Sequence, residues 1–226
     1  RHFEKFIKCA DWLVDNLERN SHGYKVWMHH FDWEYRDMLK SPWYSGLAQG
    51  QGISVLVRAY KETKIKKYQK SAHEAFEVFN ISTLNGGVNF LDKRGNNWIE
   101  EYIVHPPTHI LNGFIWGLWG VYDYSLQFNS KLASNLFDNY IETLCKELKS
   151  YDTGYWSLYE HSGTRLKMIA SMFYHRLHIV QLRVMYNLTN KDIFEKMAKI
   201  WTSYLNKFFN RQLAFIYKVI FKIFYY

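Results

Sequence analysis

The chain has 226 residues, which is enough to bury a full core, and one domain is the expectation for this length. Its formal charge of +8 favours polyanionic partners, and its 19% of aromatic residues suits either sugar-ring faces or a large aromatic core. Two isolated cysteines, Cys9 and Cys145, offer neither a disulfide framework nor a cysteine zinc site, and scattered basic residues without a recognised motif argue against a nucleic-acid binder.

The first quarter of the chain alternates helical and extended patterns. Apolar spacing predicts a helix over residues 3–19, and partial alternation of aromatic residues predicts extended structure over 24–35. Two further helices are predicted over 45–61 and 66–79. Three glycines in the first of these are costly in a helix unless close packing needs them: Gly46, Gly50 and Gly52.

A β-hairpin is predicted from strands over 88–91 and 98–104. Alternation along the second strand would place Glu101 on the same face as Ile99. A carboxyl beside an isoleucine would be partly buried, and burial raises a carboxyl pKa toward the range of a general base. An exposed acidic strand end is the competing interpretation.

The rest of the chain repeats the same alternation. Residues 108–128 are apolar nearly all round, which is typical of an inner helix, and His109, Asn112, Asp123 and Gln127 argue against a membrane span. Further elements are an outer helix over 131–148, an aromatic turn over 151–159, helices over 171–188 and 191–208, and an apolar tail over 213–226. With Lys218 and Lys222 one turn apart, that tail suits an interfacial amphipathic helix or packs on the body.

Three helix pairs separated by aromatic hairpins start about 63 residues apart. This pattern predicts a mainly α fold, an incomplete (α/α) toroid of helical hairpins with short β-hairpins gathered at one rim. We expect a single domain over 1–226, with an N-terminal segment 1–44, helix-pair units over 45–208 and the tail 209–226.

Five blocks of sequence, in order, resemble the C-terminal domain of D-glucuronyl C5-epimerases: 45–60 (SGLAQGQGISVLVRAY), 98–102 (WIEEY), 111–114 (LNGF), 151–154 (YDTG) and 174–182 (YHRLHIVQL). Those enzymes convert glucuronate to iduronate within heparan-type chains. The resemblance implies an α/α toroid, an isomerase acting on an acidic heparosan-like polysaccharide, and no cofactor or essential metal.

The resemblance also implies roles for individual residues. Glu101 and Tyr102 fall on the family's Glu-Glu-Tyr motif, and Tyr159 and Tyr174 fall on its other two tyrosines. We hypothesise that Glu101 and Tyr174 are the two bases and that Tyr102 and Tyr159 donate hydrogen bonds to the substrate. Arg165 is the expected clamp for the uronate carboxylate. The other candidate substrate-binding residues are His175, His178, Asn112, Trp98 and Gln49.

Some of these residues have alternative interpretations. His175 and His178 have a spacing that metals use, but without a third ligand a packed or hydrogen-bonded role is favoured, and no metal site is predicted. Asn112 fits a hydrogen-bond donor of the inner helix better than a catalytic group.

The chain departs from the animal enzymes in three ways. Tyr159 is followed by Glu160-His161-Ser162 where they have Asp-Leu-Arg, and Ser171-Met172-Phe173 replaces their Arg-Trp-Asp. Their β-rich N-terminal portion has no counterpart in these 226 residues. Polymer specificity is therefore left open.

Other functions remain in view. A polysaccharide lyase begins with the same proton abstraction, and a glycoside hydrolase would need Glu101 with Asp152 or Glu160. A noncatalytic module that binds anionic glycans would use the aromatic residues and the positive charge. Membrane association would come only through the tail or a missing N-terminal segment, a homodimer is left open, and the compartment cannot be read from the sequence.

Overall fold

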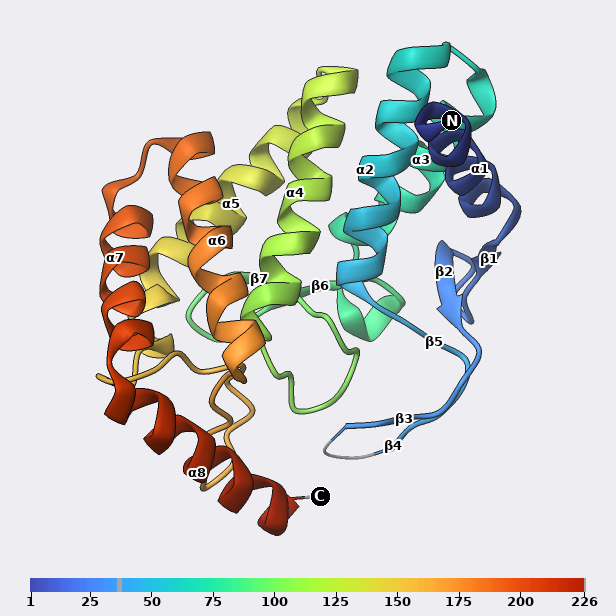
Figure 1. Ribbon diagram of the computed structural model, residues 1–226. Helices are drawn as coiled ribbons and strands as arrows, with labels where there is room; N and C mark the ends of the chain where they lie inside the picture. The colour runs from blue at the N-terminus through green and yellow to red at the C-terminus, as the bar shows by residue number, and fades with distance from the viewer. Residues whose placement is uncertain (36–37, 226) are drawn as a thin grey trace. The chain divides into compact units, whose positions relative to one another are not determined.

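The computed structural model describes residues 1–35 and 38–225, which form two compact units (Figure 1). Unit 1 comprises Arg1–Val104 and Gly113–Ile141, and unit 2 comprises His105–Asn112 and Glu142–Tyr226. Helices dominate both units, which confirms the predicted mainly helical class. Within the described part of the chain, none of the helices is both long and apolar enough to cross a membrane.

The first helix is shorter than predicted. α1 (His2–Asp15) is followed by strand β1 (Leu17–Arg19), so the helix predicted over 3–19 was wrong at its C-terminal end. Leu17 is buried where β1 pairs antiparallel with β2 (Lys25–His29). The apolar side chain of Leu17 continues the helical spacing of α1, but pairing of β1 with β2 buries it just as well. The periodicity of apolar residues therefore cannot distinguish a longer helix from a short strand here.

Short strands fill the aromatic segment that follows. The second edge of β2 pairs with β5 (Trp43–Tyr44), and β3 (Trp33–Glu34) pairs with β4 (Met38–Leu39), all antiparallel. Extended structure over 24–35 is therefore confirmed in β2 and β3.

Three helix pairs confirm the predicted pattern. They are α2 (Gly46–Thr63) with α3 (Lys66–Phe76), α4 (Leu111–Phe128) with α5 (Lys131–Glu147), and α6 (Met172–Thr189) with α7 (Asp192–Asn206). Ser45 and Ser171 cap the first and third pairs through their side-chain oxygens, which accept backbone N–H bonds and stabilise the helix starts. Short 3-10 helices lie at η1 (Glu77–Asn80), η2 (Thr83–Asn85) and η3 (Leu148–Tyr151).

Gly50 allows α2 to pack closely on α4 (Figure 1), whereas Gly46 lies against Glu100 and Gly52 against the ring of Trp27. A Cβ on Gly50 would lie 2.5 Å from the Cα of Gly117, and one on Gly120 would overlap the Gly50 backbone. The helix-propensity cost of these glycines is thus offset by a backbone approach that a side chain would prevent.

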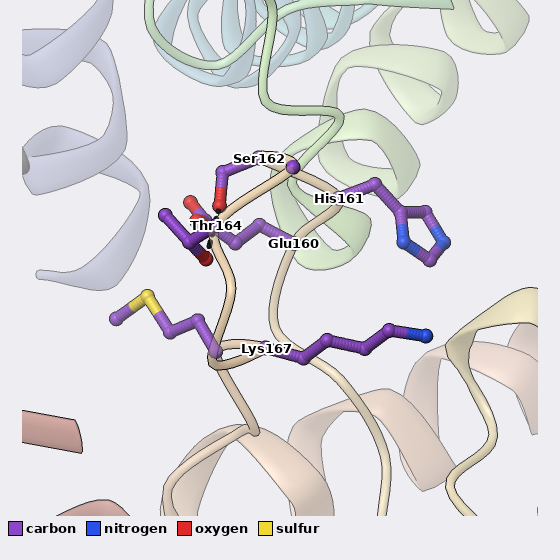
Figure 2. Close-up of a pocket in the computed structure, with 7 residues that line it drawn as sticks. Glu160, His161, Ser162, Thr164 and Lys167 are labelled. Atoms are coloured by element: carbon purple, nitrogen blue, oxygen red, sulfur yellow. Dashed lines mark hydrogen bonds between the residues drawn. The ribbon is translucent and has the colours of Figure 1, made fainter.

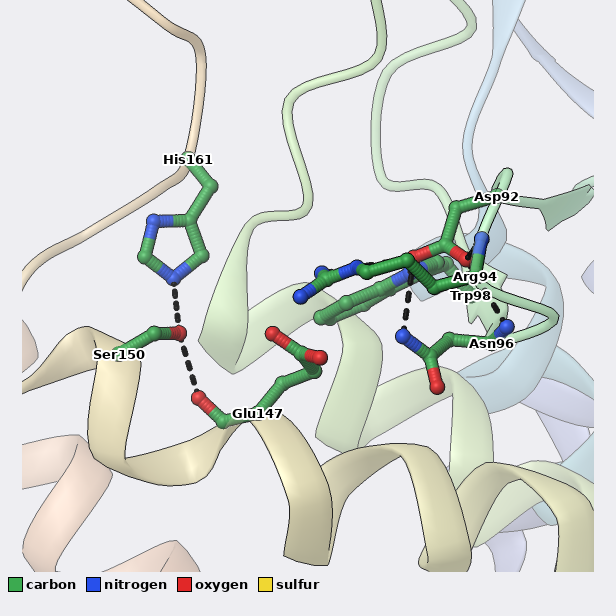
Figure 3. Close-up of polar contacts among 7 residues, drawn as sticks. All are labelled: Asp92, Arg94, Asn96, Trp98, Glu147, Ser150 and His161. Atoms are coloured by element: carbon green, nitrogen blue, oxygen red, sulfur yellow. Dashed lines mark hydrogen bonds and ion pairs between the residues drawn. The ribbon is translucent and has the colours of Figure 1, made fainter.

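The predicted hairpin forms, but its second strand is shorter than expected. β6 (Asn89–Leu91) pairs with β7 (Asn97–Ile99), and Asp92 stabilises the turn by accepting bonds from the backbone N–H groups of Arg94 and Asn96 at 2.8 and 2.9 Å (Figure 3). These bonds and one from Trp98 outweigh the cost of burial and hold the pKa of Asp92 at about 2.

The strand predicted over 98–104 was wrong beyond Ile99. The N–H of Glu100 bonds to the carbonyl of Val88 at 2.9 Å, and its carbonyl accepts the N–H of Gly46, at the start of α2, at 3.0 Å. The chain therefore leaves the hairpin at Glu100, and the expected alternation of faces does not extend to Glu101, which lies in the following bend.

Unit 2 surrounds the aromatic turn with α6, α7 and α8 (Phe208–Tyr225). The hairpin expected over 151–159 is reduced to isolated bridges, one of which joins Asp152 to Ser157. α8 covers the predicted tail except Tyr226, which lies outside the described residues. Ala214 and Phe221 of α8 are buried, so one face packs, while its remaining large apolar side chains are exposed.

Candidate active site

Glu101 is a buried carboxyl in unit 1, on the bend between β7 and α4. It is 8% exposed, and a Cβ on Gly113 would overlap its side chain, so the carboxylate lies directly against the first turn of α4. Burial raises the pKa of Glu101 to about 8; a hydrogen bond from Tyr102 opposes this shift and the charge of Glu100 adds to it. A carboxyl of this kind can take up and release a proton near neutral pH.

Tyr102 stands beside Glu101 in an aromatic cluster of unit 1. Its ring centroid lies 4.6 Å from that of Tyr35 and 5.6 Å from that of Trp43, and the residue is 8% exposed. Packing on two sides fixes the ring, which preorganises the hydroxyl that bonds to Glu101.

Two other candidates in unit 1 are core residues. Gln49 is fully buried: its Oε1 accepts the N–H of Trp27 at 2.8 Å, and its Nε2 donates to the carbonyl of Ala75 at 3.2 Å. The Trp98 ring is buried against Phe114 with centroids 5.3 Å apart. Neither side chain reaches the surface, and a role of either in substrate binding stays a prediction.

Tyr159 and Tyr174 lie together in unit 2, with ring centroids 4.9 Å apart. The backbone of Tyr159 is held on both sides, by the carbonyl of Met168 at 2.8 Å and by the N–H of Leu111 at 3.1 Å. Tyr174 lies in the first turn of α6, directly after the Ser171 cap. Two phenols that are 15 positions apart in sequence thus form one pair.

His175 and His178 lie in the interior of unit 2. Their Nδ1 atoms are 2.8 and 3.0 Å from the Ser157 hydroxyl, and His175 Nε2 lies 3.0 Å from the carbonyl of Trp201. The N–H of Ser157 points at His175 Nδ1, so Nε2 carries the proton and donates to Trp201. Burial lowers the pKa of His175 to about 4 and that of His178 to about 3. Both imidazoles are therefore neutral and hydrogen-bonded in the interior, and their contact with substrate stays a prediction.

The remaining candidates of unit 2 differ in exposure. Asn112 is 3% exposed, and its carbonyl accepts a bond from Gln181 Nε2 at 3.0 Å, which ties the start of α4 to α6. Arg165 is exposed on the loop before α6. Asp152, a carboxylate considered for a hydrolase, accepts bonds from Trp201 Nε1 and the Tyr204 hydroxyl, each at 3.3 Å, and so braces α7.

A cavity of about 170 Å³ is lined by Glu160 to Thr164, Lys167 and Met168, on the loop that follows Tyr159 in the chain (Figure 2). The Glu160 side chain lies on the same side of the loop as Ser162 and Thr164, whereas His161 points away. His161 Nε2 is 2.7 Å from the Ser150 hydroxyl (Figure 3). Burial raises the pKa of Glu160 to about 7, opposed by a hydrogen bond from Ser162 and by the charge of Lys218.

Lys218 of α8 lies near Tyr159, a position that the sequence did not predict. Its Nζ donates to the carbonyl of Ile169 at 3.0 Å and lies 5.9 Å from the ring centroid of Tyr159. The only sequence signal was a lysine in an apolar helix, which does not specify a partner. Across residues 1–35 and 38–225, no three His, Cys, Asp or Glu side chains are grouped so that they could hold a metal ion.

Comparisons with known proteins give a consistent result. Residues 19–203 match the protein family described as D-glucuronyl C5-epimerase C-terminus. The chain is 32% identical to a D-glucuronyl C5-epimerase of Caenorhabditis elegans over 90% of its own length and 35% of that protein's length. An uncharacterised protein of Methanocaldococcus jannaschii is 26% identical to this chain over 88% of this chain's length and 64% of the archaeal protein's length.

A solved structure confirms the fold. The glycoside hydrolase family 76 mannosidase of Bacteroides thetaiotaomicron superposes with a TM-score of 0.55 and 13% identity, over 88% of this chain and 53% of the mannosidase. This similarity confirms the predicted α/α toroid class and carries no inference about the reaction. The chain spans about a third of the nematode epimerase and under two thirds of the archaeal protein, while α8 lies beyond the matched family segment.

Proposed function

This chain belongs to the D-glucuronyl C5-epimerase C-terminus family, and from that premise we propose that it is a carbohydrate epimerase that inverts C5 of glucuronate residues in an acidic polysaccharide. The product would be iduronate. The observation that carries the proposal is Glu101, a buried carboxyl with a raised pKa at the position of the family's Glu-Glu-Tyr motif.

The chemistry sets three requirements. One group removes the proton at C5, which is α to the carboxylate, and the electron pair of the C–H bond moves onto that carboxylate. A second group returns a proton to the opposite face of C5. A third group stabilises the negative charge that accumulates between the two steps. The reaction is redox-neutral, so no external oxidant or reductant is needed.

We assign the first proton transfer to Glu101 in its ionised form. A carboxylate whose pKa is near 8 is a stronger base than an ordinary one, and about a tenth of it is ionised at pH 7. Tyr102 donates a hydrogen bond that favours this ionised form. Abstraction leaves Glu101 protonated, and exchange with water restores the carboxylate.

We assign the second proton transfer to the Tyr174 hydroxyl, with Tyr159 as its neighbour and as a hydrogen-bond donor to the sugar. The contact between the two rings supports a shared role, because packing of one fixes the other. After donation, Tyr174 is left as a phenolate, which takes up a proton from water. In the opposite direction of the reaction Tyr174 is the base and Glu101 is the acid.

A heparosan-like polymer is the substrate we propose. A formal charge of +8 supports binding of a polyanion, and the aromatic content supports stacking on sugar rings. The relationship to the nematode epimerase supports the glucuronyl unit.

The test is incubation of N-deacetylated, N-sulfated heparosan with the protein in deuterated water, followed by proton NMR. We expect loss of the C5 proton signal and appearance of iduronate. Glu101→Gln and Tyr174→Phe should each lower the rate of C5 exchange at least about a hundredfold. Glu62→Gln, an exposed glutamate of α2, and Tyr186→Phe, further along α6, are the matched controls and should keep the rate.

The other outcomes separate the alternatives. Chain cleavage with an unsaturated uronate would identify a lyase, and binding without deuterium incorporation would identify a glycan-binding module. Exchange at the wild-type rate in either active-site variant would remove that residue from the mechanism.

A further inference from the structure

Helix α8 brings a cation to the tyrosine pair of unit 2. It begins at Phe208, after the last residue of the segment that matches the family. Its buried positions, Ala214 and Phe221, lie on both sides of Lys218 in sequence, so this lysine faces the body of unit 2 while Lys222 is exposed.

The contacts of Lys218 fix where its ammonium lies. Nζ is 3.0 Å from the carbonyl of Ile169, 5.9 Å from the ring centroid of Tyr159 and 5.7 Å from that of Phe221. Ile169 pairs with Leu158, the residue before Tyr159. The Lys218 ammonium therefore lies beside the pair of segments formed by Leu158 and Ile169, directly before Tyr159 in the chain.

The surroundings of Lys218 are partly desolvated, and the charged groups that act on it are the buried Glu160 and the exposed Lys222. Burial lowers the pKa of Lys218 to about 8, with the charge of Glu160 opposing this shift and that of Lys222 adding to it. On the loop next to the pair, Arg165 and Lys167 are exposed, where water weakens their attraction for an anion.

An ammonium has three N–H donors, and the carbonyl of Ile169 takes one of them. A half-buried lysine costs desolvation energy that a methionine of similar length would not. Packing alone does not account for this choice of residue. Burial raises the pKa of Glu160 to about 7, so this neighbour is only partly ionised at neutral pH, and an anionic ligand would be held more strongly here than at the exposed Arg165.

We propose that Lys218 is the cation that binds the uronate carboxylate at the Tyr159–Tyr174 pair, in the role that sequence reasoning gave to Arg165. The assignment rests on the proposed function for the identity of the anion. When the C5 proton leaves, charge builds on that carboxylate, and an ammonium already in contact with it lowers the barrier without reorganising.

The test compares two ligands by isothermal titration calorimetry: a heparosan hexasaccharide, and the same chain with its carboxyls reduced to hydroxymethyl groups. The wild type should prefer the carboxylate form by about tenfold or more, the range of one charge-assisted contact. Lys218→Met should remove this preference, and Lys218→Arg should keep most of it. Lys222→Met removes the same charge one turn away and should change the preference less than about threefold.

Thermal unfolding followed by circular dichroism checks each variant, and Lys218→Gln replaces the methionine variant if that one does not fold. Retention of the carboxylate preference in Lys218→Met or Lys218→Gln would overturn the assignment, as would an equal loss in Lys222→Met. A wild type with the preference but without deuterium exchange would refute the epimerase and leave Lys218 as the anion-binding residue. If the wild type exchanges deuterium and the Lys218 variants keep the preference for the carboxylate ligand, the role of Lys218 is refuted and the epimerase proposal stands.

Discussion

Replacing Glu101 with glutamine should remove a pH dependence of stability that burial of this carboxyl creates. The folded-state pKa of about 8 is above the ordinary value of 4.5, so the folded protein binds the proton more tightly than the unfolded chain does. Glu101 therefore contributes stability that is complete below about pH 4.5 and is lost as pH rises through about 8.

The size of the effect follows from the same two values. At about 1.4 kcal/mol per pH unit, the free energy of unfolding of the wild type should fall relative to Glu101→Gln by at most about 5 kcal/mol across this interval. The glutamine variant has no proton to lose there. It should therefore become the more resistant of the two as the solution becomes alkaline, whatever its stability in acid.

Urea unfolding, followed by circular dichroism between about pH 4 and pH 9, measures the difference between the two proteins, from which groups common to both cancel. Glu62→Gln on the exposed surface of α2 is the control and should track the wild type throughout. A flat difference between the wild type and Glu101→Gln, or one that rises with pH, would refute the raised pKa that burial gives this carboxyl.

Two further variants test the packing of each unit. Gly50→Ala should lower the free energy of unfolding by about 1–3 kcal/mol, because its Cβ would meet the Cα of Gly117 at 2.5 Å. Gln51→Ala, on the exposed side of α2, is the control and should change the free energy of unfolding by less than about 0.5 kcal/mol. Thermal unfolding of both variants measures the two changes. Between about pH 6.5 and pH 5 the wild type should lose about 2 kcal/mol of stability more than His178→Asn does. In the folded wild type the buried imidazole of His178 stays neutral, whereas in the unfolded chain it takes up a proton, and the asparagine variant has no such group. The exposed His2 replaced by Asn is the control for urea titrations at those two values, and equal losses in wild type and His178→Asn would contradict the neutral, buried histidine.

Much of the fold was predictable because it is encoded locally. The three helix pairs follow from apolar spacing and from caps such as Ser45 and Ser171, which act within one turn of the chain. The glycines of α2 signalled close approaches, and the structure identifies the partners as α4 for Gly50, Glu100 for Gly46 and Trp27 for Gly52.

Errors appeared where a distant segment competes for the backbone. Leu17 leaves the predicted helix to pair with β2, and the predicted strand ends where the carbonyl of Glu100 accepts the N–H of Gly46. In both cases the hydrogen-bond partner is remote in sequence, so periodicity carries no information about it.

The sequence by itself determined the helical class and the resemblance to an epimerase family, since each depends on residue type and short-range order. The burial of Glu101 depends on its contact with Gly113 of α4, which the predicted alternation did not contain. Only the tertiary structure decided which polar candidates are enclosed. Periodicity tells which residues share a face of a helix, but what covers that face comes from elsewhere in the chain. That is why His175 and His178 became core residues under Ser157, and why Lys218 lies by the ring of Tyr159, 59 positions earlier in the chain.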